Sequence, residues 1–114
     1  MAGGACVICA SADLLDGGEG VRFTVTRPTG EEPAFVIRHG GRVRAYLNRC
    51  AHVPVELDWQ PGRFFDAERH YLICATHGAL YEPGSGYCFA GPCKGRTLVP
   101  VEVEERDGGI YLVG

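Results

Sequence analysis

Two short segments of the chain each combine one cysteine with one histidine. Cys50 precedes His52 by two positions, and Cys74 precedes His77 by three. Because 21 residues separate His52 from Cys74, the four side chains reach one point only if two loops approach each other tip to tip. Thiolate and imidazole groups are both good ligands for transition metals. The pattern therefore predicts a metal centre held by Cys50, His52, Cys74 and His77.

Two kinds of metal centre use two cysteines and two histidines. One is a tetrahedral zinc ion, and the other is a [2Fe–2S] cluster with both cysteines on one iron and both histidines on the other. Structural zinc modules usually pair like ligands a few residues apart, whereas each segment here supplies one ligand of each type. The spacing favours one [2Fe–2S] cluster per chain, with zinc as the alternative.

The composition is that of a small globular protein without a strongly charged surface. The 114 residues have a formal net charge of −3, with 46% hydrophobic and 22% charged residues. The sequence shows no basic stripe of the kind that binds nucleic acid and no apolar run as long as a transmembrane helix. Met1–Leu15 contains no basic residue, so we expect no export signal. These features predict a cytoplasmic protein that binds neither nucleic acid nor membrane.

Short β-prone runs separated by turn signals dominate the chain. The runs that predict strands are Val21–Val25, Ala34–Ile37, Val43–Leu47, the alternating segment Val99–Val103 and Ile110–Val113, with hairpin turns at His39–Gly41 and Asp107–Gly109 and a helical turn at Ala12–Leu15. Residues 48–95 are instead rich in Cys, His, Gly and Pro. We therefore expect one all-β domain, residues 1–114, with an inserted cluster-binding subdomain at roughly 48–95.

The ligand segments and a later Gly–Pro pair resemble those of one known family. Asn48–His52, Cys74–Gly78 and Gly91–Pro92 resemble the Rieske family, above all its small ferredoxins and ferredoxin-like proteins. The resemblance covers nearly the whole chain and implies the Rieske fold, an antiparallel β-sandwich or barrel with two cluster-binding loops at one end. It also implies that Cys50 and Cys74 hold a buried iron, that His52 and His77 hold an outer iron, and that Gly91–Pro92 lies in a third loop that shields the cluster.

The departures from the family pattern bear on the reduction potential. High-potential members have a disulfide between their ligand loops, and the matching positions here are Val55 and Thr76. Those members also place a serine, which donates to a cluster sulfur, where this chain has Ala79, whereas a tyrosine that donates to a cysteine sulfur is retained as Tyr81. Fewer donors stabilise the reduced cluster less. We therefore expect a potential in the lower part of the Rieske range of about −150 to +300 mV.

The resemblance implies an electron-transfer protein rather than an enzyme. It implies a carrier that takes single electrons from a flavin reductase and delivers them to a terminal oxygenase or reductase. No facial triad of two histidines and a carboxylate is evident outside the ligand segments. Three alternatives remain open: a small Rieske-like subunit of a reductase such as assimilatory nitrite reductase, a redox sensor, and a zinc-stabilised interaction module.

Four cysteines lie outside or beside the ligand pattern. Cys88 and Cys93 flank the expected third loop, and their separation allows a disulfide if the geometry permits. For a cytoplasmic protein we favour two thiols packed near the cluster. Cys6 and Cys9 form a C-x-x-C pair, but no strand–helix pattern follows it, so we expect buried or incidental thiols rather than a thioredoxin-like site.

Overall fold

The computed structural model of the chain describes residues 6–28, 30–51, 55–58, 60, 62–74 and 78–113. Within these residues the secondary structure is almost entirely β. The strands are β1 (Cys6–Ala10), β2 (Val21–Arg27), β3 (Gly30–His39), β4 (Arg42–Leu47), β5 (Leu72–Ile73), β6 (Leu80–Tyr81), β7 (Cys88–Ala90), β8 (Pro100–Val101), β9 (Val103–Arg106) and β10 (Gly109–Leu112), and η2 (Ser11–Asp13) is a short 3₁₀ turn. The prediction of an all-β chain is confirmed.

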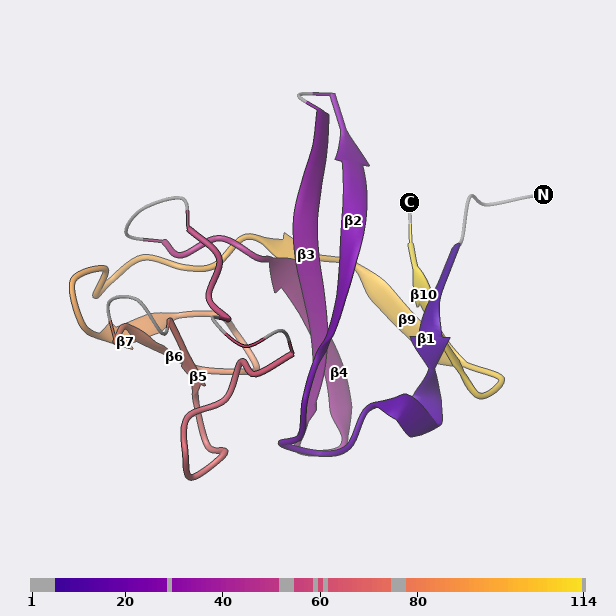
Figure 1. Ribbon diagram of the computed structural model, residues 1–114, viewed down its shortest axis with the longest axis horizontal. Coiled ribbons are helices and arrows are strands. Elements are labelled where there is room, and N and C mark those ends of the chain that lie inside the picture. Colours follow the sequence, from indigo (N-terminus) through magenta and orange to yellow (C-terminus); the bar gives the residue numbers. More distant parts are fainter. Residues whose placement is uncertain are drawn as a thin grey trace.

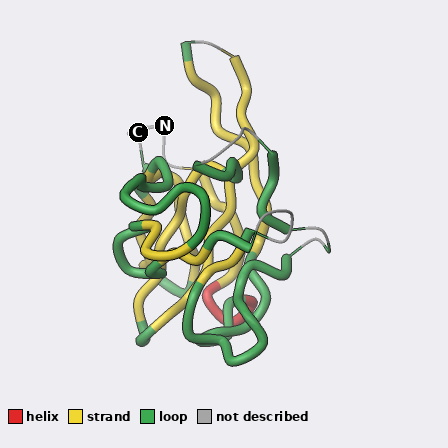
Figure 2. The backbone as a smooth tube through the Cα atoms, turned by 90° about the vertical axis from the view of Figure 1, so that its left-hand side faces the viewer, coloured by secondary structure: helices red, strands yellow, loops and turns green. Residues whose placement is uncertain are grey.

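The described strands form three antiparallel sheets. The central sheet has the order β2–β3–β4–β8, the terminal sheet β1–β10–β9 and the loop sheet β5–β6–β7. Figure 1 shows the loop sheet and the terminal sheet on opposite sides of the central sheet. Seen from the loop-sheet side in Figure 2, much of that end consists of loops. The segment richest in Cys, His, Gly and Pro therefore occupies one end of the molecule.

The central sheet is built from two hairpins that share β3. The β3–β4 turn falls at Gly40 and Gly41, as predicted, and both have positive φ angles of 62° and 80°. Such angles favour glycine, because a Cβ would strain the backbone there. Strand β3 pairs with β2 over Gly30–Val36 and with β4 over Ala34–His39, so each of its residues pairs with a neighbouring strand on at least one side. This continuous pairing gives the sheet a firm centre between two packed faces.

Each face of β3 contributes to a different core. Phe35 and Ile37 pack into a cluster with the loop sheet, here called the loop core, whereas Ala34 and Val36 pack against the terminal sheet in the terminal core. All four side chains are fully buried. Alternate residues of a strand point to opposite faces, so an unbroken apolar run is required where both faces are covered. The run Ala34–Ile37 therefore meets two different neighbours.

The segment Val99–Val103, expected to be one strand, is instead divided between two sheets. Strand β8 pairs with β4 at Ala45–Val101, and β9 pairs with β10 in the terminal sheet. Glu102 lies between them, and its carbonyl accepts a hydrogen bond from Val113 at 3.1 Å. The chain changes sheets at this residue, which is how packed sheets form a corner. The second predicted hairpin is confirmed, with Asp107 and Gly108 at its turn.

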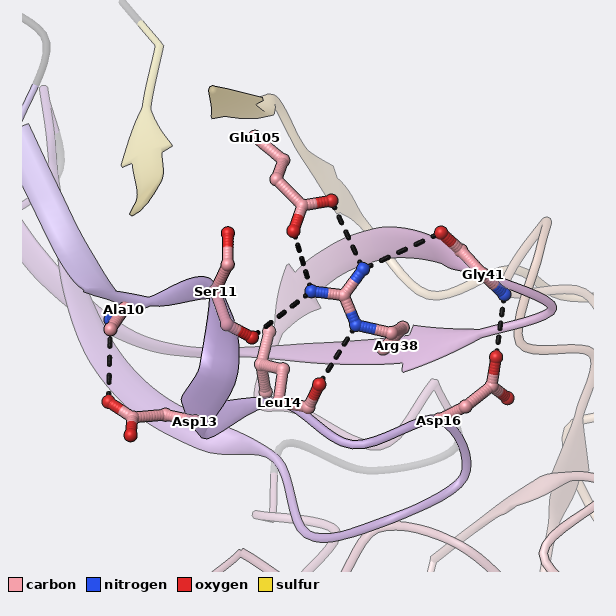
Figure 3. A network of polar contacts seen from close by, with 8 residues as sticks. All are labelled: Ala10, Ser11, Asp13, Leu14, Asp16, Arg38, Gly41 and Glu105. Carbon is pink, nitrogen blue, oxygen red and sulfur yellow. Dashed lines mark hydrogen bonds and ion pairs between the residues drawn. The ribbon is translucent and has the colours of Figure 1, made fainter. Parts of the chain in front are cut away.

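A partly buried arginine joins the N-terminal segment to the central and terminal sheets (Figure 3). Arg38, on β3, donates to the carbonyl oxygens of Ser11 and Leu14 at 3.2 and 2.8 Å. Its guanidinium also forms a two-pronged pair with Glu105 of β9, at 3.1 and 2.6 Å. The predicted helical turn is the 3₁₀ turn η2, shifted slightly toward the N-terminus. Among the described residues, no helix has the length and apolar character needed to cross a membrane.

Candidate metal centre

Cys50 and Cys74 lie just beyond two strands that lead into the same core. Cys50 comes shortly after β4, and Cys74 directly follows β5. Their exposed fractions are only 3% and 0%, and both belong to the loop core. The structure thus brings the two predicted sulfur ligands into one buried environment. His52 and His77, the two predicted imidazole ligands, lie outside the described residues.

The first ligand loop is held by a buried polar network that the sequence analysis did not identify. The Cys50 amide donates to the Val55 carbonyl oxygen at 2.7 Å, which closes the loop. Asn48, 1% exposed, donates from its side-chain amide to Asp58 Oδ1 at 2.9 Å and accepts from the Leu57 amide at 2.9 Å. Buried polar groups are stable when they are paired in this way. The network fixes both ends of the loop that contains Cys50.

Asp58 extends this network to the edge of the central sheet. Its Oδ2 accepts from the Gly62 amide at 2.9 Å and lies 3.5 Å from Arg22 Nε. The Asp58 side chain is fully buried, whereas Arg22 is about one-third exposed at 37%. A buried carboxylate requires such donors to offset the loss of water. No sequence motif around Asp58 predicts this role, because its partners come from three separate parts of the sequence.

The second ligand loop is closed by two short backbone hydrogen bonds. The Cys74 amide donates to the Ala79 carbonyl oxygen at 2.9 Å, and the Gly78 amide donates to the Cys74 carbonyl oxygen at 2.7 Å. Gly78 has a positive φ of 72°, a conformation that glycine adopts without strain. The chain therefore reverses between β5 and β6 within a few residues, with Cys74 at the start of the reversal.

The predicted third loop packs directly on the second ligand loop. A Cβ added to Gly91 would lie 2.8 Å from the Ala79 Cα, and Gly91 has a φ of 100°. Both facts exclude a larger residue at this position without movement of the loops. Arg96, after the third loop, donates to the Ala51 carbonyl oxygen at 3.2 Å and so reaches the first ligand loop. The three loops thus contact one another at one end of the molecule.

Tyr81 places a phenol hydroxyl beside the Cys50 sulfur. The side chain is fully buried, and its Oη lies 3.3 Å from Cys50 Sγ. The Ala51 amide donates to the same oxygen at 3.0 Å, and the Cys93 thiol lies 3.2 Å away. Burial, reinforced by the hydrogen bonds to Cys50 and Cys93, raises the pKa of Tyr81 far above its ordinary value. The hydroxyl stays protonated and donates to Cys50 when that sulfur is a thiolate, because a thiolate has no proton to give.

The remaining cysteines divide into a close pair and a peripheral one. The Cys88 and Cys93 sulfurs lie 2.7 Å apart, and both residues are buried in the loop core. Cys9 is partly buried on β1 against the terminal core, and burial is the main cause that raises its pKa. The side chain of Cys6 lies outside the described residues. The described sulfurs near the expected site are therefore Cys50, Cys74, Cys88 and Cys93.

The donor set fits a metal centre with a buried, sulfur-ligated side. Two enclosed cysteines follow paired strands, and a protonated phenol lies beside one of them. Soft thiolate ligands suit iron–sulfur clusters and zinc, and hydrogen bonds to a ligand sulfur tune the metal that it holds. The fold and the two enclosed cysteines fit the class of small antiparallel β proteins that hold a metal centre.

Residues 4–104 match the family model described as the Rieske [2Fe-2S] domain, and the chain belongs to this family. Membership confirms the predicted Rieske fold and one [2Fe–2S] cluster per chain, in place of the zinc alternative. A Rieske cluster exchanges electrons at a potential that its ligands and surroundings set. The chain is accordingly an electron-transfer protein rather than a catalyst.

Relatives and solved structures are similar over most of the chain. The ferredoxin component of the alkene monooxygenase system of Xanthobacter autotrophicus (strain ATCC BAA-1158 / Py2) is 35% identical over 109 residues, which cover 94% of this chain and 78% of the relative. The ferredoxin of carbazole 1,9a-dioxygenase from Nocardioides aromaticivorans IC177 is 21% identical with a TM-score of 0.70, covering 96% of both chains. A chain in the complex of reduced oxygenase and oxidized ferredoxin in carbazole 1,9a-dioxygenase is 24% identical with a TM-score of 0.71, covering 96% of this chain and 93% of that one.

Proposed function

We propose that this protein carries single electrons from a flavin reductase to a terminal oxygenase in a multicomponent oxygenase system. The observation that carries the proposal is the 35% identity with the ferredoxin component of an alkene monooxygenase system, over 94% of this chain. The cluster supplies reversible one-electron exchange when it is bound. The protein's own residues then have to hold the ligand loops still and set how readily an electron is accepted.

The proposed ligands are Cys50 and Cys74 for the inner iron and His52 and His77 for the outer iron. The burial of the two cysteines, at 3% and 0% exposure, supports their assignment to the inner position. The two histidines are assigned from the motif and from family membership. Because each loop supplies one ligand to each iron, all four ligands can bind the cluster only if the two loops lie at the right distance from each other.

The surrounding residues keep the first ligand loop rigid as the charge of the centre changes. Asn48, Asp58 and the backbone bond from Cys50 to Val55 fix the loop from its buried side. Tyr81 donates its proton toward Cys50 and stays neutral while doing so. Fixed donors and dipoles need little reorganisation when charge develops beside them. These residues therefore favour rapid electron exchange, because the loop does not have to rearrange when the charge changes.

The proposed potential lies in the lower part of the Rieske range of about −150 to +300 mV. Ala79 is fully buried and has no side-chain donor, where high-potential members have a serine. Tyr81 retains one donor to Cys50. A spectroelectrochemical titration of the purified protein tests this expectation, and a midpoint near the top of the range would contradict it.

We also propose that residues 1–114 form a single domain located in the cytoplasm. Strand β3 contributes to both cores, so the loop sheet and the terminal sheet each share their core with the central sheet. The cytoplasm keeps cysteine side chains reduced, which suits thiols that are needed as metal ligands. If the chain is a single domain, it should unfold in one cooperative transition. A backbone signal and a cluster signal, recorded in the same unfolding experiment, should then change together.

The decisive experiment measures the cluster and its electron transfer separately. After anaerobic purification, two irons per chain and a [2Fe–2S] electron paramagnetic resonance signal on dithionite reduction are expected, and His52→Ala should remove that signal. Stopped-flow mixing of the reduced protein with a terminal oxygenase from the same source should then oxidise the cluster. A loaded cluster that no oxygenase oxidises, but that copurifies with the large subunit of a nitrite reductase, would replace the carrier by an accessory subunit.

A further inference from the structure

The Cys88 and Cys93 pair lies one contact away from the proposed cluster ligand Cys50. Cys93 Sγ lies 3.2 Å from Tyr81 Oη, and Tyr81 Oη lies 3.3 Å from Cys50 Sγ. On its other side, Cys93 Sγ lies 2.7 Å from Cys88 Sγ. The four groups form a continuous chain from the sulfur pair through the phenol to the ligand sulfur. A chemical change at the pair therefore reaches the ligand through a single hydroxyl group.

The backbone keeps the two cysteines in this position. The Cys88 amide donates to the Arg96 carbonyl oxygen at 2.8 Å, and the Cys88 carbonyl oxygen accepts from the Gly95 amide at 2.9 Å. The Arg96 amide donates in turn to the Cys93 carbonyl oxygen at 2.9 Å. These bonds fix the turn on both sides of the third loop. Because the sulfurs already lie at 2.7 Å, a bond of about 2.05 Å between them needs only a small side-chain adjustment.

We propose that Cys88 and Cys93 are a reversible disulfide site, oxidised by a small peroxide, whose state controls the hydrogen bond from Tyr81 to Cys50. The disulfide itself is independent of the cluster, whereas its effect on the cluster rests on the proposed ligand role of Cys50. High-potential members of the family have a disulfide between their ligand loops. That disulfide is a different feature, because the matching positions in this chain are Val55 and Thr76.

The oxidation balances as two steps with hydrogen peroxide as the two-electron oxidant. One thiol first reacts with peroxide to give a sulfenic acid and water. The second thiol then displaces water from that sulfenic acid, so that one sulfur–sulfur bond forms and both thiol hydrogens leave in water. A thiol reductant supplies two electrons and two protons to reverse the reaction. Peroxide suits this site because both sulfurs are buried, at 0% and 1% exposure, and a small oxidant needs less opening of the third loop than a larger disulfide does.

The dithiol is the resting state of this pair. Burial, together with the neighbouring Cys93 thiol, raises the pKa of Cys88 to about 11. The thiolate is the reactive form of cysteine, so little of Cys88 is reactive at neutral pH and oxidation is slow. The site therefore responds to sustained peroxide rather than to a brief exposure.

Disulfide formation removes one donor from Tyr81. In the dithiol, the Cys93 thiol and the Ala51 amide both donate to the phenol oxygen, which leaves the phenol proton for Cys50. Donors to a hydroxyl strengthen the bond that the hydroxyl itself donates. The disulfide has no S–H group, so the bond from Tyr81 to Cys50 weakens and the reduced cluster is less stabilised. The midpoint potential of the cluster should therefore fall when the pair is oxidised.

The first test maps the sulfurs of the cluster-loaded protein before and after incubation with hydrogen peroxide. Denaturation in N-ethylmaleimide followed by trypsin gives the peptide from His70 to Lys94, which contains Cys74, Cys88 and Cys93. We expect three labels on this peptide before oxidation and one, on Cys74, afterwards, with three restored by dithiothreitol. Three labels after prolonged peroxide, or irreversible addition of oxygen to either sulfur, would overturn the disulfide.

The second test measures the midpoint potential of matched variants that retain two irons per chain. Wild-type protein should shift to a lower potential on oxidation and return on reduction. Cys88→Ser keeps the Cys93 donor but blocks the disulfide, so its potential should not respond to peroxide. Cys93→Ala lacks the donor and should remain at the lower potential throughout. A disulfide that forms without shifting the potential would overturn the link through Tyr81, whereas absence of a cluster in all variants would instead count against the proposed function.

Discussion

The two cores on opposite faces of the central sheet differ in the kind of side chain that fills them. The buried members of the terminal core are all aliphatic, namely Leu14, Val25, Ala34, Val36, Ala45, Leu47, Val101 and Ile110. The loop core instead contains four cysteines and two tyrosines among its buried members. Strand β3 lies between the two cores and contributes side chains to both. One face of the sheet is thus packed for stability alone, and the other combines packing with groups that can bind metal or donate protons.

This difference teaches how a small chain accommodates a reactive site. Groups such as thiols and phenols require partners when they are buried, and each partner limits what the neighbouring residues can be. The aliphatic core makes no such demand, because its contribution scales with the apolar area removed from water. We therefore expect substitutions in the terminal core to change stability, and equally mild substitutions in the loop core to change the chemistry.

The largest expected effect is the loss of the cluster when a sulfur ligand is removed. Cys50→Ala should purify without iron, because no other thiol is proposed at that position of the cluster. Ile110→Val, an equally buried change in the terminal core, should keep two irons per chain and lose only about 0.5–1.5 kcal/mol of stability. Iron analysis and the visible absorption spectrum compare the two variants, and retention of iron by Cys50→Ala would refute the ligand assignment.

A smaller effect is expected from the carboxylate that holds the first ligand loop. Asp58→Ala leaves Asn48 and the Gly62 amide without their acceptor, which should cost about 1–3 kcal/mol and speed the release of iron to a chelator. The control is Glu56→Gln, because Glu56 also contacts Arg22, at 2.5 Å, but is 45% exposed. Exposed ion pairs contribute about 0–1 kcal/mol. Urea unfolding and iron-release kinetics measure both variants; equal rates of release would show that Asp58 does not hold the loop.

A still smaller and more specific change is expected from the two buried tyrosines of the loop core. Tyr81→Phe removes the donor to Cys50 and should lower the midpoint potential, because the reduced cluster loses a hydrogen bond. Tyr46→Phe makes the same chemical change in a residue whose hydroxyl donates to the Pro83 carbonyl oxygen at 2.7 Å. Its potential should match that of the wild type. Protein-film voltammetry distinguishes the two, and equal shifts in both variants would deny Tyr81 a specific role.

The sequence predicted the central sheet well because its strands follow simple patterns. The hairpin turn at Gly40–Gly41 and the apolar run Ala34–Ile37 both reflect local rules about backbone and burial. The division of Val99–Val103 between two sheets was not predicted, because the alternation of side chains continues smoothly across Glu102. Which sheet a residue joins depends on long-range packing, and β1 was missed for the same reason.

The same distinction applies to the metal centre. Cys50 and Cys74 were identified from their spacing to histidines, and the structure places both in one buried core. Asp58 was not identified, because its partners Asn48, Gly62 and Arg22 are brought together only by the folded chain. The close approach of Cys88 and Cys93 was left open by the sequence, since separation along the chain does not fix the distance between two sulfurs.

The smallest effect is expected on the terminal-core side, where the ion pair of Arg38 and Glu105 joins β3 to β9. The hydrogen bond from Arg38, and then that from Ser11, lowers the pKa of Glu105 from 4.5 to about 2. The folded state thus binds this proton less tightly than the unfolded state. The contribution to stability is therefore complete above about pH 5 and is lost as the pH falls toward 2.

Glu105→Gln should accordingly flatten the dependence of the unfolding free energy on pH between about 4.5 and 2. Arg38→Gln should flatten the same interval, and the double variant should add nothing further, because the two side chains act as one pair. Urea unfolding at a series of pH values measures these slopes. The iron content and the midpoint potential at neutral pH should not change in Glu105→Gln, since its partners lie on the opposite side of the central sheet from Cys50. A shift in potential would show that the two faces of the sheet are coupled, and would contradict the separation between a core for stability and a core for chemistry.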